Sequence, residues 1–146
     1  GTSLDLENKP NKALWSNDML VPFDEENDKR TYTFTNIWNN SVYYHGNVPN
    51  NEFKLYKKVT IVLGKSVSSK ESFRFTLGKS DYMKISNISL KKGDKIVYDG
   101  VQTWRNGTPI NHRCTNAQPK FYPGWNDFAF NQQVKSVTFD MKFYYK

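Results

Sequence analysis

The sequence predicts an all-β protein, an antiparallel β-sandwich or jelly roll with little or no helix. Aromatic residues make up 16% of the 146 residues and stand in short runs with Thr, Ser and Val between Gly, Asn and Pro, a composition typical of strands and turns. Apolar residues alternate with polar ones in several runs, and no segment repeats them at helical spacing over the roughly ten positions that a helix needs. We therefore expect about eight to ten short strands joined by tight turns.

Residues 1–40 and 41–146 differ in pattern. The first part is polar and weakly patterned, so we expect an N-terminal arm, a linker or an edge strand there, although "TYTFT" at 31–35 alternates like a half-buried strand. We expect residues 41–146 to form one sandwich domain, because a chain of this length buries a single core. We also expect the chain to be a fragment of a longer protein, since no initiating Met is present and Gly1–Ser3 resembles an expression remnant.

Three later runs alternate clearly enough to assign a core face to each. "EFKLYKKVTIVLG" (52–64) predicts a central strand, "SFRFTLG" (72–78) another, and "VKSVTFDMKFYYK" (134–146) a last strand with partners on both sides. The residues assigned to the core faces of these strands are Leu55, Val59, Ile61, Leu63, Phe73, Phe75, Leu77, Val137, Phe139, Met141, Phe143 and Tyr145.

Two turns are predicted between residues 91 and 107. In "KKGD" (91–94), Gly93 tolerates positive φ and Asp94 can bond its own backbone. Asn106 and Gly107 are the strongest hairpin signal in the chain, because a type I′ turn needs positive φ at both central positions.

A third turn is predicted in "FYPGWNDFAF" (121–130). Pro123 and Gly124 favour a turn that Asn126 can tie to its neighbours through its amide. The alternation that follows places Phe128 and Phe130 in the core. We expect the Trp125 side chain to pack over the end of the sandwich.

The charge and the reactive residues favour no catalytic, metal or cofactor site. The net charge of +7 comes from 21 Lys and Arg against 14 Asp and Glu, but the lysines are spread along the chain, which favours solvated strand faces over a polyanion site. Cys114 is the only cysteine, so no internal disulfide forms, and its pairing with His112 or His45 matches no known nucleophile motif. Joint binding of calcium by Asp94 and Asp99 is a minor alternative. Because the lysines are scattered, we expect no nucleic acid as a partner. We expect no membrane as a partner either, since no apolar run approaches the roughly 20 residues that span a bilayer.

Exposed aromatic residues are the remaining candidates for contact with a ligand or a partner. Aromatic faces pack on the apolar faces of sugar rings, whereas Trp and Tyr also fill cores and protein interfaces. Both interpretations stay open at this point. The candidate contact residues for a glycan or a protein are Trp15, Trp38, Tyr43, Trp104 and Trp125.

The stretch "SLKKGDKIVYDGVQTWRNGTPINHRCTNAQPKFYPGWNDFAF" (89–130) resembles the C-terminal domain of siphovirus-type tail components, the distal tail proteins of phages that infect Gram-positive bacteria. The similarity lies in an ordered series of turns and extends over roughly residues 45–146. The loop "INHRCTNAQPK" (110–120) is longer than the family's usual spacing allows. The residues that match the family's turns are Gly93, Asp94, Asp99, Asn106, Gly107, Pro123, Gly124 and Asn126.

The resemblance implies a galectin-like sandwich at the periphery of a baseplate hub. In that family the N-terminal domain forms a homo-hexameric ring, and the C-terminal sandwich points outward and holds receptor-binding or other baseplate proteins. It implies a structural, non-enzymatic virion protein, made in the host cytoplasm and located at the phage tail tip. Whether the isolated sandwich is a monomer stays open. The alternative is a non-catalytic carbohydrate-binding module for cell-wall or surface glycans.

Overall fold

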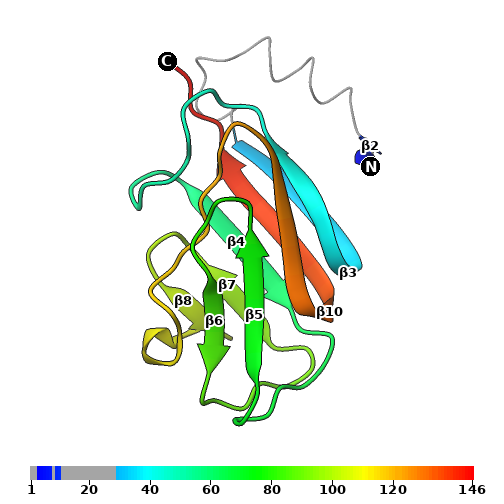
Figure 1. Ribbon diagram of the computed structural model, residues 1–146, viewed down its shortest axis with the longest axis vertical. Coiled ribbons are helices and arrows are strands. Elements are labelled where there is room, and N and C mark those ends of the chain that lie inside the picture. Colours follow the sequence, from blue (N-terminus) through cyan, green and yellow to red (C-terminus); the bar gives the residue numbers. More distant parts are fainter. Residues whose placement is uncertain (1–2, 8, 11–28) are drawn as a thin grey trace.

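The protein is an antiparallel all-β fold whose main sheet curls into two layers (Figure 1), so the predicted fold class is confirmed. The computed structural model describes residues 3–7, 9–10 and 29–146. Trp15 lies outside these residues. No helix within the described ranges is long and apolar enough to cross a membrane.

Eight strands form the main sheet, in the order β6-β5-β10-β4-β7-β8-β9 with β3 paired to β10, and β1 pairs separately with β2. The elements are β1 (Ser3–Glu7), β2 (Lys9–Pro10), β3 (Lys29–Tyr44), β4 (Lys57–Val62), β5 (Ser72–Leu77), β6 (Met83–Ser86), β7 (Lys95–Tyr98), β8 (Thr103–Arg105), β9 (Thr108–Pro109), the 3₁₀ turn η1 (Asn111–Arg113) and β10 (Gly124–Lys142).

Two of these strands are long, which differs from the short strands that the sequence predicts. β3 has 16 residues and β10 has 19, and they pair with each other over nearly their whole length. On its other side, β10 pairs first with β5 at 128–130 and then with β4 at 136–141. Figure 1 shows the orange first half of β10 in the front layer and its red second half in the back layer. The β3–β10 ribbon therefore belongs to both layers.

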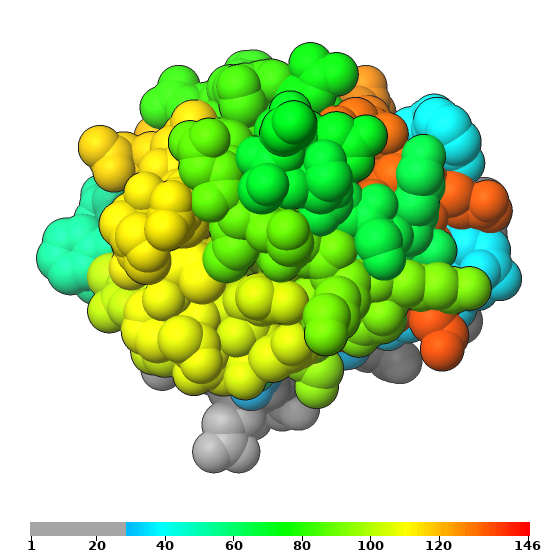
Figure 2. Space-filling model, turned by 90° about the horizontal axis from the view of Figure 1, so that it is seen from below, coloured from blue at the N-terminus to red at the C-terminus, as the bar shows by residue number. Residues whose placement is uncertain are grey.

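The ribbon turns from one layer to the other at a corner. Ala129 pairs with Asn39 and Val134 with Ile37, so five steps along β10 match two along β3. Asn36 of β3, which directly precedes Ile37 at this irregularity, has a φ of 50°. Such an irregularity bends a strand and interrupts its ladder of hydrogen bonds. Figure 2 shows the molecule from below, where green and yellow residues cover most of the visible face and orange and red residues reach it only toward one side.

Three consecutive amide side chains supply the hydrogen bonds that the ladder lacks at the corner. Asn131 accepts from Arg74 N and donates to Ser72 O, at 3.0 and 2.8 Å. Gln132 accepts from Gly64 N and Lys65 N at 3.1 and 3.0 Å and donates to Lys65 O at 3.1 Å. Gln133 donates to Asn36 O at 3.0 Å. Since buried backbone groups need partners, these amides make the bend possible.

The core lies between the layers and is rich in aromatic rings. Phe73, Phe75 and Leu77 are buried as predicted, as are Val137, Phe139, Met141 and Phe143. Phe128 from the front half of β10 meets Phe139 from its back half, with ring centroids 4.9 Å apart. Removing such a ring, as in Phe139→Ala, is expected to cost about 3–5 kcal/mol of stability.

β3 also bears on the expected division at residue 40. It runs without a break from Lys29 to Tyr44 and, among the described strands, pairs with β10 alone, so it is an edge of the described sheet. The boundary at 40/41 therefore falls inside one strand, and residues 29–40 share the sheet with the rest of the domain.

Candidate functional site

The turn at Gly93–Asp94 and the hairpin at Asn106–Gly107 lie against each other in the back layer. Asp94 accepts hydrogen bonds from Lys91 N at 2.8 Å, from Arg105 Nε at 2.8 Å and from Asn106 Nδ2 at 3.1 Å. Asn106 and Gly107 have φ of 49° and 85°, which matches the predicted type I′ turn. These motif residues therefore hold one another in place.

The electrostatics of Asp94 follow from this network. Burial opposes ionisation of the carboxyl, but the hydrogen bonds from Lys91, Asn106 and Arg105 outweigh it and lower the pKa of Asp94. The carboxylate forms a salt bridge with Arg105 in a largely buried position. An ion pair of this kind is a fixed part of the fold.

Asp99 closes the turn that follows β7. Its carboxylate accepts from Val101 N and Gln102 N at 2.9 and 2.7 Å and from Trp104 Nε1 at 2.9 Å. Burial opposes ionisation of Asp99, but these hydrogen bonds outweigh burial, so the pKa of Asp99 lies below its ordinary value. Asp94 and Asp99 thus each serve their own turn, and no three His, Cys, Asp or Glu side chains among the described residues gather as a metal site would require.

Asn126 ties the third predicted turn, as the sequence indicates. It is 2% exposed, accepts from Tyr122 N at 3.0 Å, and donates to Tyr122 O and Gly124 O at 2.9 and 3.0 Å. Gly124, with φ of 96°, takes the positive φ that the turn needs. Trp125, between Gly124 and Asn126, does not pack over the end of the sandwich as expected, because it is 56% exposed. Successive strand residues point to opposite faces, so a buried Asn126 places Trp125 on the outside.

An open depression on the outer face of the back layer brings four predicted site residues together. Its volume is about 640 Å³, and its lining combines two lysines with the apolar Val97 and the half-buried Trp104. An aromatic ring and cations in one depression suit contact with an acidic protein surface. The residues that line the depression are Lys58, Lys95, Val97, Asp99, Trp104, Asn106 and Gly107.

On the outer face of the front layer, Trp125 pairs across the strands with Tyr43. The two rings meet edge to face with centroids 5.0 Å apart, and Tyr43 also contacts His45 at 4.5 Å. Trp38 is 54% exposed on β3, beside the corner. The structure therefore joins Tyr43 with Trp125 but places Trp104 on the opposite layer.

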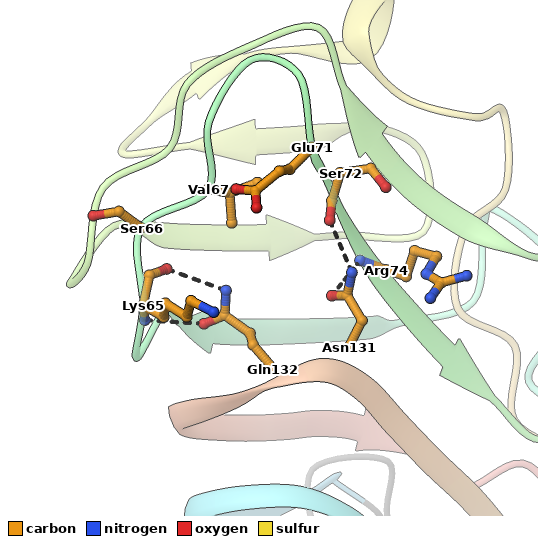
Figure 3. Close-up of a pocket in the computed structure, with 8 residues that line it drawn as sticks. All are labelled: Lys65, Ser66, Val67, Glu71, Ser72, Arg74, Asn131 and Gln132. Atoms are coloured by element: carbon orange, nitrogen blue, oxygen red, sulfur yellow. Dashed lines mark hydrogen bonds between the residues drawn. The ribbon is translucent and has the colours of Figure 1, made fainter.

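Two further hollows lie on the front layer and at the corner beside it. The first, of about 190 Å³, is lined by Arg74, Thr76, Tyr82, Ala129, Phe130 and Asn131. The second, of about 270 Å³ (Figure 3), is lined by Lys65, Ser66, Val67, Glu71, Ser72, Arg74, Asn131 and Gln132.

Cys114 and the histidines have separate surroundings. The Cys114 thiol donates to Ile110 O at 3.2 Å, and burial raises its pKa. Burial, with the nearby Arg30 cation, lowers the pKa of His45 to about 4, so this imidazole is neutral at pH 7. His112 is exposed in η1.

The buried Lys57 was missed by the sequence pattern. Its ammonium donates to Asn50 Oδ1 at 2.9 Å and to the carbonyls of Glu52 and Leu55 at 2.6 and 3.0 Å. Burial lowers the pKa of Lys57 to about 8, against the opposing effect of Glu52. Lys57 therefore fastens the loop that precedes β4.

Comparison with known proteins finds similarity among solved structures. No protein-family model matches the sequence, and neither does any curated protein. Among solved structures, the crystal structure of SPP1 Dit is similar, with a TM-score of 0.55 and 14% sequence identity over 79% of this chain. That protein is described as a paradigm of the hub adsorption apparatus of phages infecting Gram-positive bacteria, and the match spans 46% of its length. The chain thus has a Dit-like fold, similar to about half of a phage hub protein.

Proposed function

We propose that this chain is the peripheral β-sandwich module of a distal tail protein, a structural component of a phage tail hub that docks receptor-binding or other baseplate proteins. The observation that carries the proposal is the likeness of its fold to SPP1 Dit over 79% of the chain. The ordered turn motif supports it, because Asp94, Asp99 and Asn126 build the scaffold of the sandwich. In this proposal the longer protein forms a homo-hexameric ring in the virion, and the module points outward.

We assign the docking role to the depression around Trp104. A partially buried indole offers the large aromatic anchor that dominates protein interfaces, and Lys58 and Lys95 provide charges for acidic side chains of a partner. The depression is wide and open, which suits a protein surface better than a small ligand.

The first test is the location of the polypeptide. Purified virions that carry the gene are probed by mass spectrometry and by electron microscopy with antibodies raised against this chain. The expected result is label at the distal end of the tail. Label on the capsid, or absence of the polypeptide from virions, contradicts the proposal.

The second test concerns the docking surface. Tagged wild type, Trp104→Ala and Trp38→Ala are compared in their capture of tail proteins from disrupted virions. Trp104→Ala is expected to weaken capture at least tenfold, whereas Trp38→Ala, an exposed tryptophan away from the depression, leaves it unchanged. Equal losses for both variants contradict the assignment of this surface.

A further inference from the structure

The outer face of the front layer has small side chains at its centre and large ones around them. Strand register places Thr76 of β5 beside Ala129 of β10, and both side chains are small. Next along β5, Arg74 stands opposite Lys84 of β6. Tyr82, which is 46% exposed, precedes β6 and receives a hydrogen bond from Arg74 at 3.2 Å. The centre is thus a shallow floor beside an aromatic ring and a pair of cations.

The hollow on this face and the hollow at the corner are adjacent, because Arg74 and Asn131 line both of them. Their volumes of about 190 and 270 Å³ lie below the roughly 300–1,000 Å³ of pockets that enclose a drug-sized ligand. Two small neighbouring hollows with a shared wall suit two successive units of a linear polymer.

Asn131, which lies in the wall shared by the two hollows, is held in a defined position. Both polar atoms of the Asn131 amide bond backbone groups of β5, which fixes its orientation while one N–H and one lone pair stay available. Figure 3 shows Asn131 between Gln132 and Arg74, with the Arg74 guanidinium directed away from the Glu71 carboxylate. Glu71 instead accepts from Ser68 N at 2.9 Å.

The charges on this face are not balanced within the fold. Arg74 and Lys84 face each other directly across β5 and β6, an arrangement that disfavours the sheet. Neither side chain forms a salt bridge in the part of the chain that the structure describes. An anion between them would relieve this repulsion, and the planar guanidinium can hold a carboxylate or a phosphate with two hydrogen bonds.

We propose that the two adjacent hollows form one groove that binds an anionic polysaccharide. One sugar unit lies in each hollow, and the acidic substituent lies at Arg74 and Lys84. One ring lies on the Thr76–Ala129 floor against Tyr82, since aromatic surfaces pack on apolar ring faces. Asn131, between the hollows, bonds hydroxyl groups of both units. A nucleic acid fits less well, because single-stranded binding sites stack successive bases on several aromatic rings and this groove has only Tyr82 exposed for stacking among its described residues. This inference goes beyond the proposed docking function and does not depend on it.

Calorimetry with the whole chain tests the groove using three oligomers of matched length: alternating glucuronic acid and N-acetylglucosamine, phosphodiester-linked N-acetylglucosamine 1-phosphate, and neutral N-acetylglucosamine. At least one anionic oligomer is expected to bind at least tenfold more tightly than the neutral one, and added salt should weaken its binding. The carboxylated and phosphorylated oligomers distinguish the two sources of the anion. Arg74→Gln and Lys84→Gln should each lower the affinity at least fivefold, and Lys54→Gln, an exposed cation in the loop that precedes β4, should not.

Four outcomes overturn the proposal. The first is no binding of any oligomer at millimolar concentration, and the second is equal binding of the neutral and anionic oligomers. The third is loss of binding in Trp125→Ala but not in Arg74→Gln, which would move the glycan to the Trp125–Tyr43 pair. The fourth is a single-stranded oligonucleotide that binds as tightly as the anionic glycan, which would make the groove a general polyanion site.

Discussion

The two outer faces of the sandwich use their charges in opposite ways. On the back layer, the Asp94 carboxylate is paired with Arg105 and bonded by Asn106, so two turns are locked together. On the front layer, Arg74 faces Lys84 and neither has an acidic partner among the described residues. Charges that satisfy each other stabilise the fold, whereas like charges left opposite each other indicate where an external anion can bind.

The comparison also separates the motif from the candidate binding groove. The turn residues that carry the sequence resemblance are used for scaffold contacts, as Asp94 and Asn126 show. The groove residues Arg74, Tyr82 and Asn131 belong to no motif. A family motif can therefore identify a fold while the surface that binds a ligand lies elsewhere.

Among the polar substitutions that compare the two faces, the largest expected effect is that of Asp94→Ala on the back layer. The change leaves Arg105 without its partner and removes the acceptor of Lys91 N, so we expect a loss of about 2–4 kcal/mol in the free energy of unfolding. Because folding lowers the pKa of Asp94, its contribution is present above its ordinary pKa of 3.8 and is lost as pH falls through the lower folded-state value. Urea unfolding between pH 7 and pH 2 measures both effects.

The exposed Asp81, which lies 4.0 Å from Lys120 at the surface, is the matched control for this carboxylate. Asp81→Ala should change stability by less than about 0.5 kcal/mol. If Asp94→Ala costs no more than Asp81→Ala, the back layer does not depend on its charge network.

The second effect in size concerns the corner that joins the faces. Gln132→Ala leaves the N–H groups of Gly64 and Lys65 without their acceptor, so we expect a loss of about 2–3 kcal/mol. Gln133→Ala removes one bond from an exposed residue and should cost less than about 1 kcal/mol. Thermal unfolding of both variants compares them, and similar melting temperatures would show that the amide of Gln132 is dispensable.

The strands and turns were predictable because their signals are local. The alternation around Phe73 and Phe139 gave the core faces, and Asn106–Gly107 gave the hairpin, since positive φ is a property of the residues themselves. The corner was not predictable. "NQQ" at 131–133 has the composition of a loop, and the partners of Gln132 lie 67 and 68 residues away in the sequence.

The candidate surfaces were predictable only in part. Trp104 was selected by its residue type, and it does line the back-layer depression. The exposure of Trp125 depends on which way Asn126 points, and that is set by the bonds of Asn126 within its own turn. Arg74, Tyr82 and Asn131 come from three separate segments, so no local pattern could join them into a groove.

A third, smaller effect is expected from Tyr98 in the core. Its hydroxyl is buried and has no hydrogen-bond partner among the described residues, in contrast to the paired polar groups of the outer back face. Burial raises the pKa of Tyr98, so the group stays neutral. Tyr98→Phe should therefore leave stability unchanged or raise it by up to about 1 kcal/mol, as measured by urea unfolding. A loss of more than that amount would reveal a partner for the hydroxyl.

The smallest effect compares the two faces most directly. Lys84→Gln removes a cation that faces Arg74, so at low salt it should raise stability by about 0.3 kcal/mol, and about 0.5 M salt should abolish the gain because ions screen exposed charges. Lys58→Gln removes a cation that faces Asp140 on the back layer, so the same change there should lower stability by a similar amount. Parallel unfolding curves at both salt concentrations measure the two signs. If both variants shift stability in the same direction, the faces do not differ in the way that their charges imply, and the argument for an anion at Arg74 loses its basis.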